Sequence, residues 1–175
     1  MKIDKTAPAL TVDGVEGGEH GDSASITPVF TATDAASGVA SVTGAIGGLQ
    51  VKSGEALPLW KLPLGENTLT VTAKDKAGHI TEKSVTFTVT TSFDDVEALL
   101  TAFRSAGTVA GDTGNVLGAQ LDQAVKEAGK GKKDDAIKAL ERFAGFAGDA
   151  KRVTDKAASD ALIRDAQALI EQLRG

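Results

Sequence analysis

The chain has 175 residues, of which 41% are hydrophobic and 25% charged, and its formal net charge is −5. No apolar stretch approaches the roughly 20 residues that cross a bilayer, so we expect one or two globular domains and no membrane span. The acidic balance disfavours nucleic acid as a partner, and the absence of cysteine excludes disulfides and thiolate metal sites.

The composition changes near residue 91. Residues 1–91 contain 14 of the 18 Thr and all 4 Pro, whereas residues 92–175 contain 17 of the 28 Ala and all 5 Arg. Thr and Val favour strands, while Ala, Leu and Arg favour helices. We therefore expect two domains, an all-β domain over 1–91 and an all-α domain over 92–175.

The first half shows apolar side chains at every second position, which is typical of strands with one face on a core. The pattern is clearest over residues 68–73 and 85–90, and Pro28 is expected at an edge or bulge because it lacks a backbone donor. About seven short strands separated by Gly-containing turns predict a two-sheet sandwich. The remaining expected strands are 9–12, 25–33, 39–43, 49–52 and 57–62.

The second half changes to a helical period. Ser92 and Asp95 form a variant capping box before an apolar stripe, and Gly107 lies where a helix-ending glycine belongs. This spacing predicts a first helix between Ser92 and Gly107.

Three further apolar stripes follow. They predict a second helix near 115–128, a third from about Lys133 and a fourth capped by Ser159 or starting earlier at Thr154. Short connections make neighbouring helices antiparallel, so we expect an up-and-down bundle of three or four helices.

Several blocks of the first half resemble bacterial immunoglobulin-like domains, although His79 stands where that family often has Asn. The resemblance implies an immunoglobulin-like sandwich and a role as a repeat or spacer in secreted, multi-domain, surface-associated proteins. The blocks that carry it are residues 3–8, 34–39, 62–71 and 74–79.

The second half resembles the FIMAH family, a small helical module near the C-termini of bacterial extracellular proteins that include polysaccharide-degrading enzymes. Neither family brings a defined catalytic residue, so we expect no catalytic site. The matching segments are residues 93–96, 99–100, 103–107, 111–113, 136–137, 140–143, 161–163 and 168–170.

Three aspartates beside turns are the candidate ligands for a cation. Asp4, Asp34 and Asp75 offer the oxygen ligands that Ca²⁺ prefers, but Asp side chains also initiate turns, and no Asp-x-Asp-x-Asp run is present. A turn role is the alternative for all three, and Ca²⁺ is the only cofactor that the sequence suggests.

Other chemistry-bearing residues have ordinary structural interpretations. Trp60 is a candidate sugar-stacking platform, but its apolar neighbours also place it in the core or at its rim. His20 and His79 are expected as solvated turn residues, because neither belongs to a metal-binding spacing.

Charged clusters also have ordinary structural interpretations. The pairs Asp94-Asp95 and Asp134-Asp135 are expected in the first turns of helices, where negative charge is favourable. The basic cluster at Lys130, Lys132 and Lys133 is expected to be a solvated loop, with contact to an anionic polysaccharide as the alternative.

Together these patterns predict a non-catalytic accessory or spacer fragment from the C-terminal part of a secreted bacterial protein, extracellular or at the cell surface. Its expected partners are upstream catalytic or adhesive domains of the same polypeptide and polysaccharide or cell wall, and we expect a monomer. The alternatives are a dedicated carbohydrate-binding module and an adhesin repeat stiffened by Ca²⁺.

Overall fold

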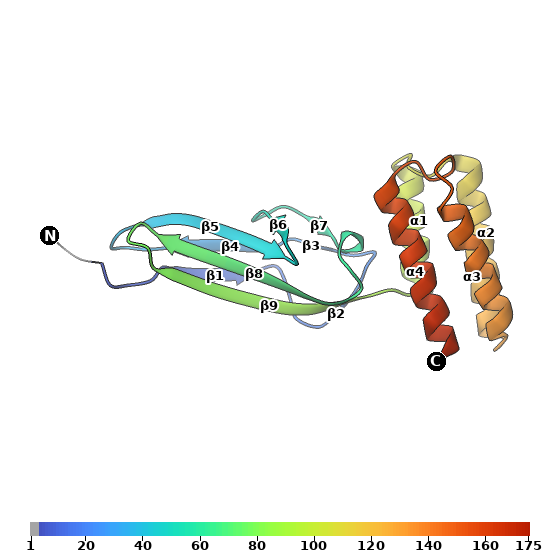
Figure 1. Cartoon of the computed structure of the whole chain (residues 1–175), viewed down its shortest axis with the longest axis horizontal. Coiled ribbons are helices and arrows are strands. Elements are labelled where there is room, and N and C mark those ends of the chain that lie inside the picture. The colour runs from blue at the N-terminus through green and yellow to red at the C-terminus, as the bar shows by residue number, and fades with distance from the viewer. Residues whose placement is uncertain (1–3) are drawn as a thin grey trace. The chain divides into compact units, whose positions relative to one another are not determined.

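The computed structural model describes residues 4–175, so the first three residues of the expected β domain lie outside it. The chain divides into two compact units, the first ending at Thr90 and the second starting at Thr91. Within the described residues the first unit contains strands and one short 3-10 helix, and the second contains four helices (Figure 1).

The strands of the first unit form three hydrogen-bonded groups. A five-stranded sheet has the order β2-β9-β8-β5-β6, and two pairs, β1-β4 and β3-β7, complete the unit. The strands are β1 (Ala9–Asp13), β2 (Glu19–Gly21), β3 (Ser25–Ile26), β4 (Val29–Thr33), β5 (Val39–Ile46), β6 (Leu49–Val51), β7 (Leu57–Pro58), β8 (Gly65–Asp75) and β9 (Ile80–Thr90).

A single hydrophobic core joins these layers. Leu10 and Phe30, from β1 and β4, are buried together with Leu69 and Val71 of β8 and Phe87 of β9. The arrangement is a two-layer β-sandwich followed by a helical bundle, which confirms the predicted fold class.

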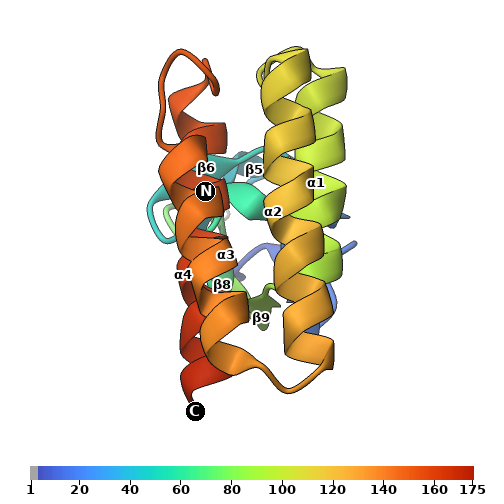
Figure 2. The same ribbon diagram turned by 90° about the vertical axis from the view of Figure 1, so that its right-hand side faces the viewer.

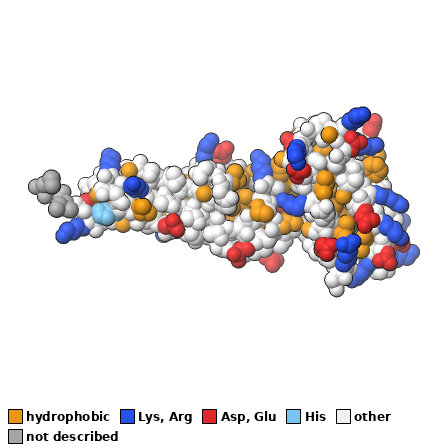
Figure 3. Space-filling view, in the orientation of Figure 1, with side chains coloured by type: hydrophobic (Ala, Val, Ile, Leu, Met, Phe, Trp, Pro, Cys, Tyr) orange, Lys and Arg blue, Asp and Glu red, His pale blue; other side chains and the backbone are white. Residues whose placement is uncertain are grey.

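The alternation along β8 explains how this sheet faces both core and solvent. Leu69, Val71 and Ala73 are each 0% exposed, whereas Thr68 and Thr70 point outward and contact Thr86 and Ser84 of β9 through hydroxyl pairs of 3.0 and 3.2 Å. Such cross-strand pairs stabilise a sheet. On the face that Figure 3 shows, few charged side chains lie on the first unit, and most of its surface is backbone and side chains that are neither charged nor hydrophobic.

Two expected strands are interrupted. The predicted strand 25–33 is divided into β3 and β4 at Pro28, which has no N–H to donate and whose carbonyl accepts a bond from Gly54 (2.7 Å). The predicted strand 57–62 ends after Pro58, and a 3-10 helix η1 (Leu59–Lys61) continues the chain. Leu59 and Leu62 are buried, and Leu59 reaches the core from this helical turn rather than from a strand.

The sequence analysis did not predict strand β2. Its three residues lack alternating hydrophobicity, and they pair parallel to β9, with Glu19 opposite Thr88 and Gly21 opposite Thr90. The pairings of the other strands are antiparallel within the described residues.

The second unit is a closed four-helix bundle. Each of α1 (Phe93–Ser105), α2 (Gly111–Gly129), α3 (Lys133–Ala147) and α4 (Lys156–Arg174) packs on its neighbours in sequence, and α1 also packs on α4. Figure 2 shows α2 and α3 side by side. Val109 and Val153 form a β-bridge between the α1–α2 and α3–α4 loops, so these loops lie at the same end, as up-and-down topology requires.

The ends of α1 are as the sequence predicts. The Ser92 hydroxyl accepts a hydrogen bond from the Asp95 amide (3.2 Å) and donates one to the Asp95 carboxylate (2.6 Å). At the other end Gly107 has φ +74°, and the Thr108 amide donates to the Phe103 carbonyl (3.0 Å), which completes a Schellman motif.

Two helix starts differ from the sequence prediction. Helix α2 begins at Gly111 rather than near residue 115. The sequence did not reveal this earlier start because the glycine-rich first turn shows little apolar periodicity. Helix α4 is capped neither by Ser159 nor at Thr154: the Asp155 carboxylate accepts a bond from the Ala158 amide (2.9 Å), and Ser159 donates its hydroxyl proton to the Ala147 carbonyl (2.8 Å).

The bundle core is formed by Ala and Leu side chains around one fully buried aromatic ring, that of Phe143. None of the helices within residues 4–175 is both long and apolar enough to cross a bilayer. The buried leucines include Leu99, Leu100, Leu117, Leu121, Leu140, Leu162 and Leu169.

Candidate functional site

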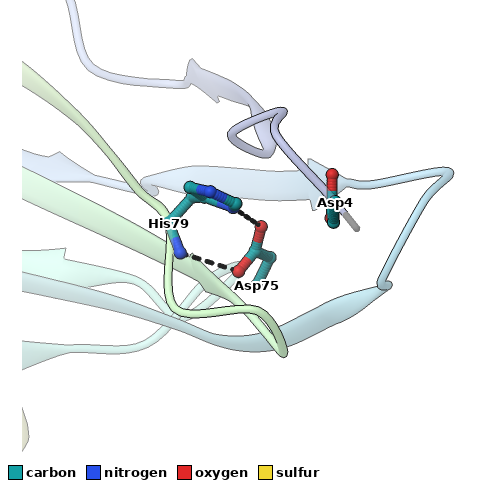
Figure 4. A group of neighbouring side chains, drawn as sticks. All are labelled: Asp4, Asp75 and His79. Atoms are coloured by element: carbon teal, nitrogen blue, oxygen red, sulfur yellow. Dashed lines mark hydrogen bonds and ion pairs between the residues drawn. The ribbon is translucent and has the colours of Figure 1, made fainter. Parts of the chain in front are cut away.

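Two carboxylates and one imidazole come together at one end of the sandwich (Figure 4). Asp75 is the last residue of β8, His79 directly precedes β9, and Asp4 lies in the segment before β1. One ligand atom from each side chain lies within 4.8 Å of one from each of the other two. The sequence analysis identified both aspartates as candidates but not the histidine. We call these three residues the Asp-Asp-His cluster.

The turn between β8 and β9 holds Asp75 and His79 in contact. The Asp75 carboxylate accepts one bond from the His79 amide and faces the Nδ1 atom of the same residue, both at 2.8 Å. The Asp75 amide in turn donates to the His79 carbonyl (3.1 Å), and Gly78 supplies a φ of +100° that closes the turn. Asp75 is only 1% exposed, so the imidazole is paired with a buried carboxylate.

These contacts shift the pKa of both partners. Burial opposes ionisation of Asp75, but the bonds from the His79 side chain and backbone outweigh it and lower the pKa of this carboxyl. The hydrogen bond to Asp75 raises the pKa of His79 above its ordinary value, with smaller contributions from the charges of Asp4 and Asp34. The charged pair is therefore the favoured form.

Asp4 is tied to its own segment by one oxygen only. Its Oδ1 accepts bonds from the Thr6 amide (2.9 Å) and hydroxyl (2.8 Å). Its Oδ2 is buried and has no hydrogen-bond partner in the described part of the chain. The proximity of the Ser37 hydroxyl and the bonds from Thr6 lower the pKa of Asp4. The proton of that hydroxyl is directed at Asp34 Oδ1, at 3.3 Å, and not at Asp4.

The third candidate, Asp34, has a turn role in the structure. Its Oδ1 accepts bonds from the amides of Ala36 (3.1 Å), Ser37 (2.7 Å) and Gly38 (2.8 Å). This is the alternative that the sequence left open for an aspartate beside a turn. Asp34 differs in this respect from Asp4 and Asp75, whose side chains the fold brings together.

The expectation of two solvated turn histidines was wrong for His20, which lies in a strand, whereas His79 does lie at the β8–β9 turn but is paired with a carboxylate. The His79 side chain is 36% exposed and bonded to a buried carboxylate. His20 lies in strand β2, where its Nε2 is 3.0 Å from the Glu16 carbonyl and its ring packs edge-on against Phe87 at 5.9 Å between centroids. The departure from Asn after Gly78 was the one sequence signal that distinguished His79.

Trp60 lies in η1 and is partly exposed, with the Lys61 ammonium 5.4 Å from its ring centroid. The neighbouring groove of about 260 Å³ is lined by residues 49–52, 55–58 and Lys61, a set that does not include the indole. Trp60 thus lies between the buried Leu59 and the exposed Lys61, outside the lining of this groove.

The charged clusters of the bundle have structural partners. Asp94-Asp95 and Asp134-Asp135 lie in the first turns of α1 and α3, as predicted. The basic loop is exposed to solvent as expected, with the Lys130 and Lys132 side chains 48% and 60% exposed, and both also reach the nearly buried Glu127, at 3.0 and 3.9 Å. The bond from Lys130 lowers the pKa of Glu127 although burial opposes this.

The second unit thus defines a small, self-contained helical module. Residues 93–171 match the family described as the FIMAH domain, which confirms the predicted resemblance over this part of the chain.

No curated protein matches the sequence significantly. One solved structure with a similar chain is described as Clostridium thermocellum CbhA fibronectin(III)-like modules, at 16% identity and a TM-score of 0.39. The match covers 49% of this chain and 47% of that chain.

Proposed function

We propose that this chain is a non-catalytic accessory and spacer fragment from the C-terminal part of a secreted, multi-domain bacterial protein. In this role it positions a polysaccharide-active catalytic region or attaches it to substrate or cell surface. The observation that carries the proposal is the FIMAH domain, which follows a β-sandwich with a core of its own.

The form of both units suits positioning rather than chemistry. Each buries its apolar residues in its own core, and only the dipeptide Thr91-Ser92 separates β9 from α1. A connection this short limits the reach of one unit from the other, whereas a long Gly/Ser linker permits independent movement. When one folded unit holds a surface weakly, it raises the effective concentration of whatever is linked to it.

Affinity electrophoresis of the intact chain through gels containing plant or bacterial polysaccharides tests attachment. Retardation that survives in the Trp60→Ala variant supports the accessory role. Specific retention at sub-millimolar polysaccharide that Trp60→Ala abolishes favours a dedicated carbohydrate-binding module, the alternative suggested by the partly exposed indole. Migration unchanged in every gel removes attachment from the proposal and leaves the spacer role.

Enzymatic assays test the non-catalytic part. The intact chain is expected to show no turnover of common glycosidase and lyase substrates. Turnover that increases with the concentration of this chain and persists after further purification would contradict the proposal.

The second alternative, an adhesin repeat stiffened by Ca²⁺, depends on Asp4 and Asp75 lying in one cluster. Thermal unfolding with Ca²⁺ and with chelator distinguishes it, because a ligand that binds only the folded state raises the unfolding temperature. An unchanged melting curve on chelation would eliminate this alternative.

A further inference from the structure

We propose that Asp4, Asp75 and His79 form a binding site for a divalent transition metal of the Zn²⁺ type, which joins the segment before β1 to the β8–β9 turn. The proposal goes beyond the accessory role and does not depend on it.

The donor set is the first argument. One imidazole nitrogen and two carboxylates, with ligand atoms within 4.8 Å of one another, match the mixed nitrogen and oxygen ligands that Zn²⁺ accepts. Ca²⁺ takes six to eight oxygen ligands, and an imidazole is a poor substitute for one of them. The His79 imidazole, rather than the aspartates alone, therefore determines the class of ion.

The second argument is a buried oxygen whose hydrogen-bonding capacity is unused. Oδ2 of Asp4 is inaccessible to solvent and has no hydrogen-bond partner within residues 4–175, while Oδ1 already accepts two bonds from Thr6. A buried carboxylate oxygen without a donor is costly. A cation held by Asp4 and the two other ligands would satisfy it.

The movement required is small. Nδ1 of His79 faces Oδ2 of Asp75 at 2.8 Å, and ligands about 2.0–2.2 Å from a tetrahedral zinc lie slightly further apart than this. The metal would take the place of the proton shared by these two atoms, and that proton would pass to solvent. Three protein ligands leave one coordination position for water.

The three ligands come from segments that are distant in sequence. Asp4 precedes β1, whereas Asp75 and His79 flank the turn between β8 and β9. A metal bound to all three would cross-link the incoming chain to the central hairpin of the larger sheet. It would therefore stabilise the folded sandwich.

The test is thermal unfolding of the tag-free, chelator-treated full chain with ZnCl₂ or CaCl₂, together with calorimetric titration by ZnCl₂. Zinc is expected to raise the unfolding temperature of the sandwich, followed by Trp60 fluorescence, whereas calcium at the same concentration should not. His79→Asn and Asp4→Asn should each weaken zinc binding at least tenfold. His20→Asn is the matched control, because His20 lies outside the cluster, and it should retain the full zinc response.

Nuclear magnetic resonance keeps the test decisive if a variant fails to fold. In the wild-type chain, zinc is expected to shift the side-chain nitrogen resonances of His79 and not those of His20. The proposal is overturned if zinc gives no shift, if the response survives in both His79→Asn and Asp4→Asn, if His20→Asn removes it, or if calcium stabilises the chain as much as zinc.

Discussion

Two glycines of the helical unit are expected to respond in opposite ways to the same substitution by alanine. Gly118 lies in the middle of α2, and a Cβ built there meets no atom within 4 Å beyond its own helix and chain neighbours. Gly107 follows α1 with φ +74°, a conformation that L-residues with a side chain rarely adopt. The local backbone, rather than the space available, decides the result.

The magnitudes follow from these conformations. Alanine in a helix interior is favoured over glycine by about 0.5–1 kcal/mol, so Gly118→Ala should stabilise the bundle by this amount. A left-handed conformation costs a residue with a Cβ about 1–2 kcal/mol, so Gly107→Ala should destabilise it by that much. For a unit of this size, about 4–8 °C per kcal/mol gives a rise of about 2–8 °C for Gly118→Ala and a fall of about 4–16 °C for Gly107→Ala.

The assay is unfolding of the full chain followed by far-ultraviolet circular dichroism at the helix signal. Trp60, the only tryptophan, lies in the first unit and its fluorescence provides an internal reference. A Gly118→Ala variant less stable than the wild type, or a Gly107→Ala variant of equal stability, would refute the reasoning from backbone conformation.

Three further predictions concern contacts described above. The hydrogen bond to Asp75 raises the pKa of His79 in the folded chain above its ordinary value of 6.5. The stability that protonated His79 contributes is therefore complete below pH 6.5 and is lost as the pH rises through the pKa of the folded state. Denaturation midpoints measured in chelator should decline over that range in the wild type and stay level in His79→Asn. Ser92→Ala removes the cap of α1 and should cost about 0.5–2 kcal/mol in urea unfolding; equal midpoints would show that the cap is not needed. Phe143 is 0% exposed, so Phe143→Ala should cost about 3–5 kcal/mol in the same measurement, whereas exposed Val125→Ala should change little.

Periodicity explains how much of the fold was predictable. The alternation through Leu69, Val71 and Ala73 located β8, and the Ser92 and Gly107 signals located both ends of α1, because these features are local in sequence. Strand β2 was missed because its three residues gain their strand geometry from β9, far along the chain. A tertiary contact of this kind leaves no period to detect.

The candidate site also has one part that is local in sequence and one part that depends on the tertiary fold. Asp75 and His79 are four residues apart and flank the Gly78 turn, so their contact is local in sequence, although the sequence analysis did not predict it. The approach of Asp4 depends on how the segment before β1 is placed against the β8–β9 turn, which no spacing in the sequence encodes. The residue types were visible in the sequence, but their convergence required the fold.

The parallel pairing of β2 with β9 has a mechanical consequence. The Thr88 amide donates to the Gly18 carbonyl and the Asp22 amide to the Thr90 carbonyl, both at 2.8 Å, at the two ends of this short ladder. Tension that enters the chain before Glu19 and leaves after Thr90 pulls these strands in opposite directions along their length. The hydrogen bonds between β2 and β9 are then loaded together in shear, instead of breaking one after another from one end of the ladder.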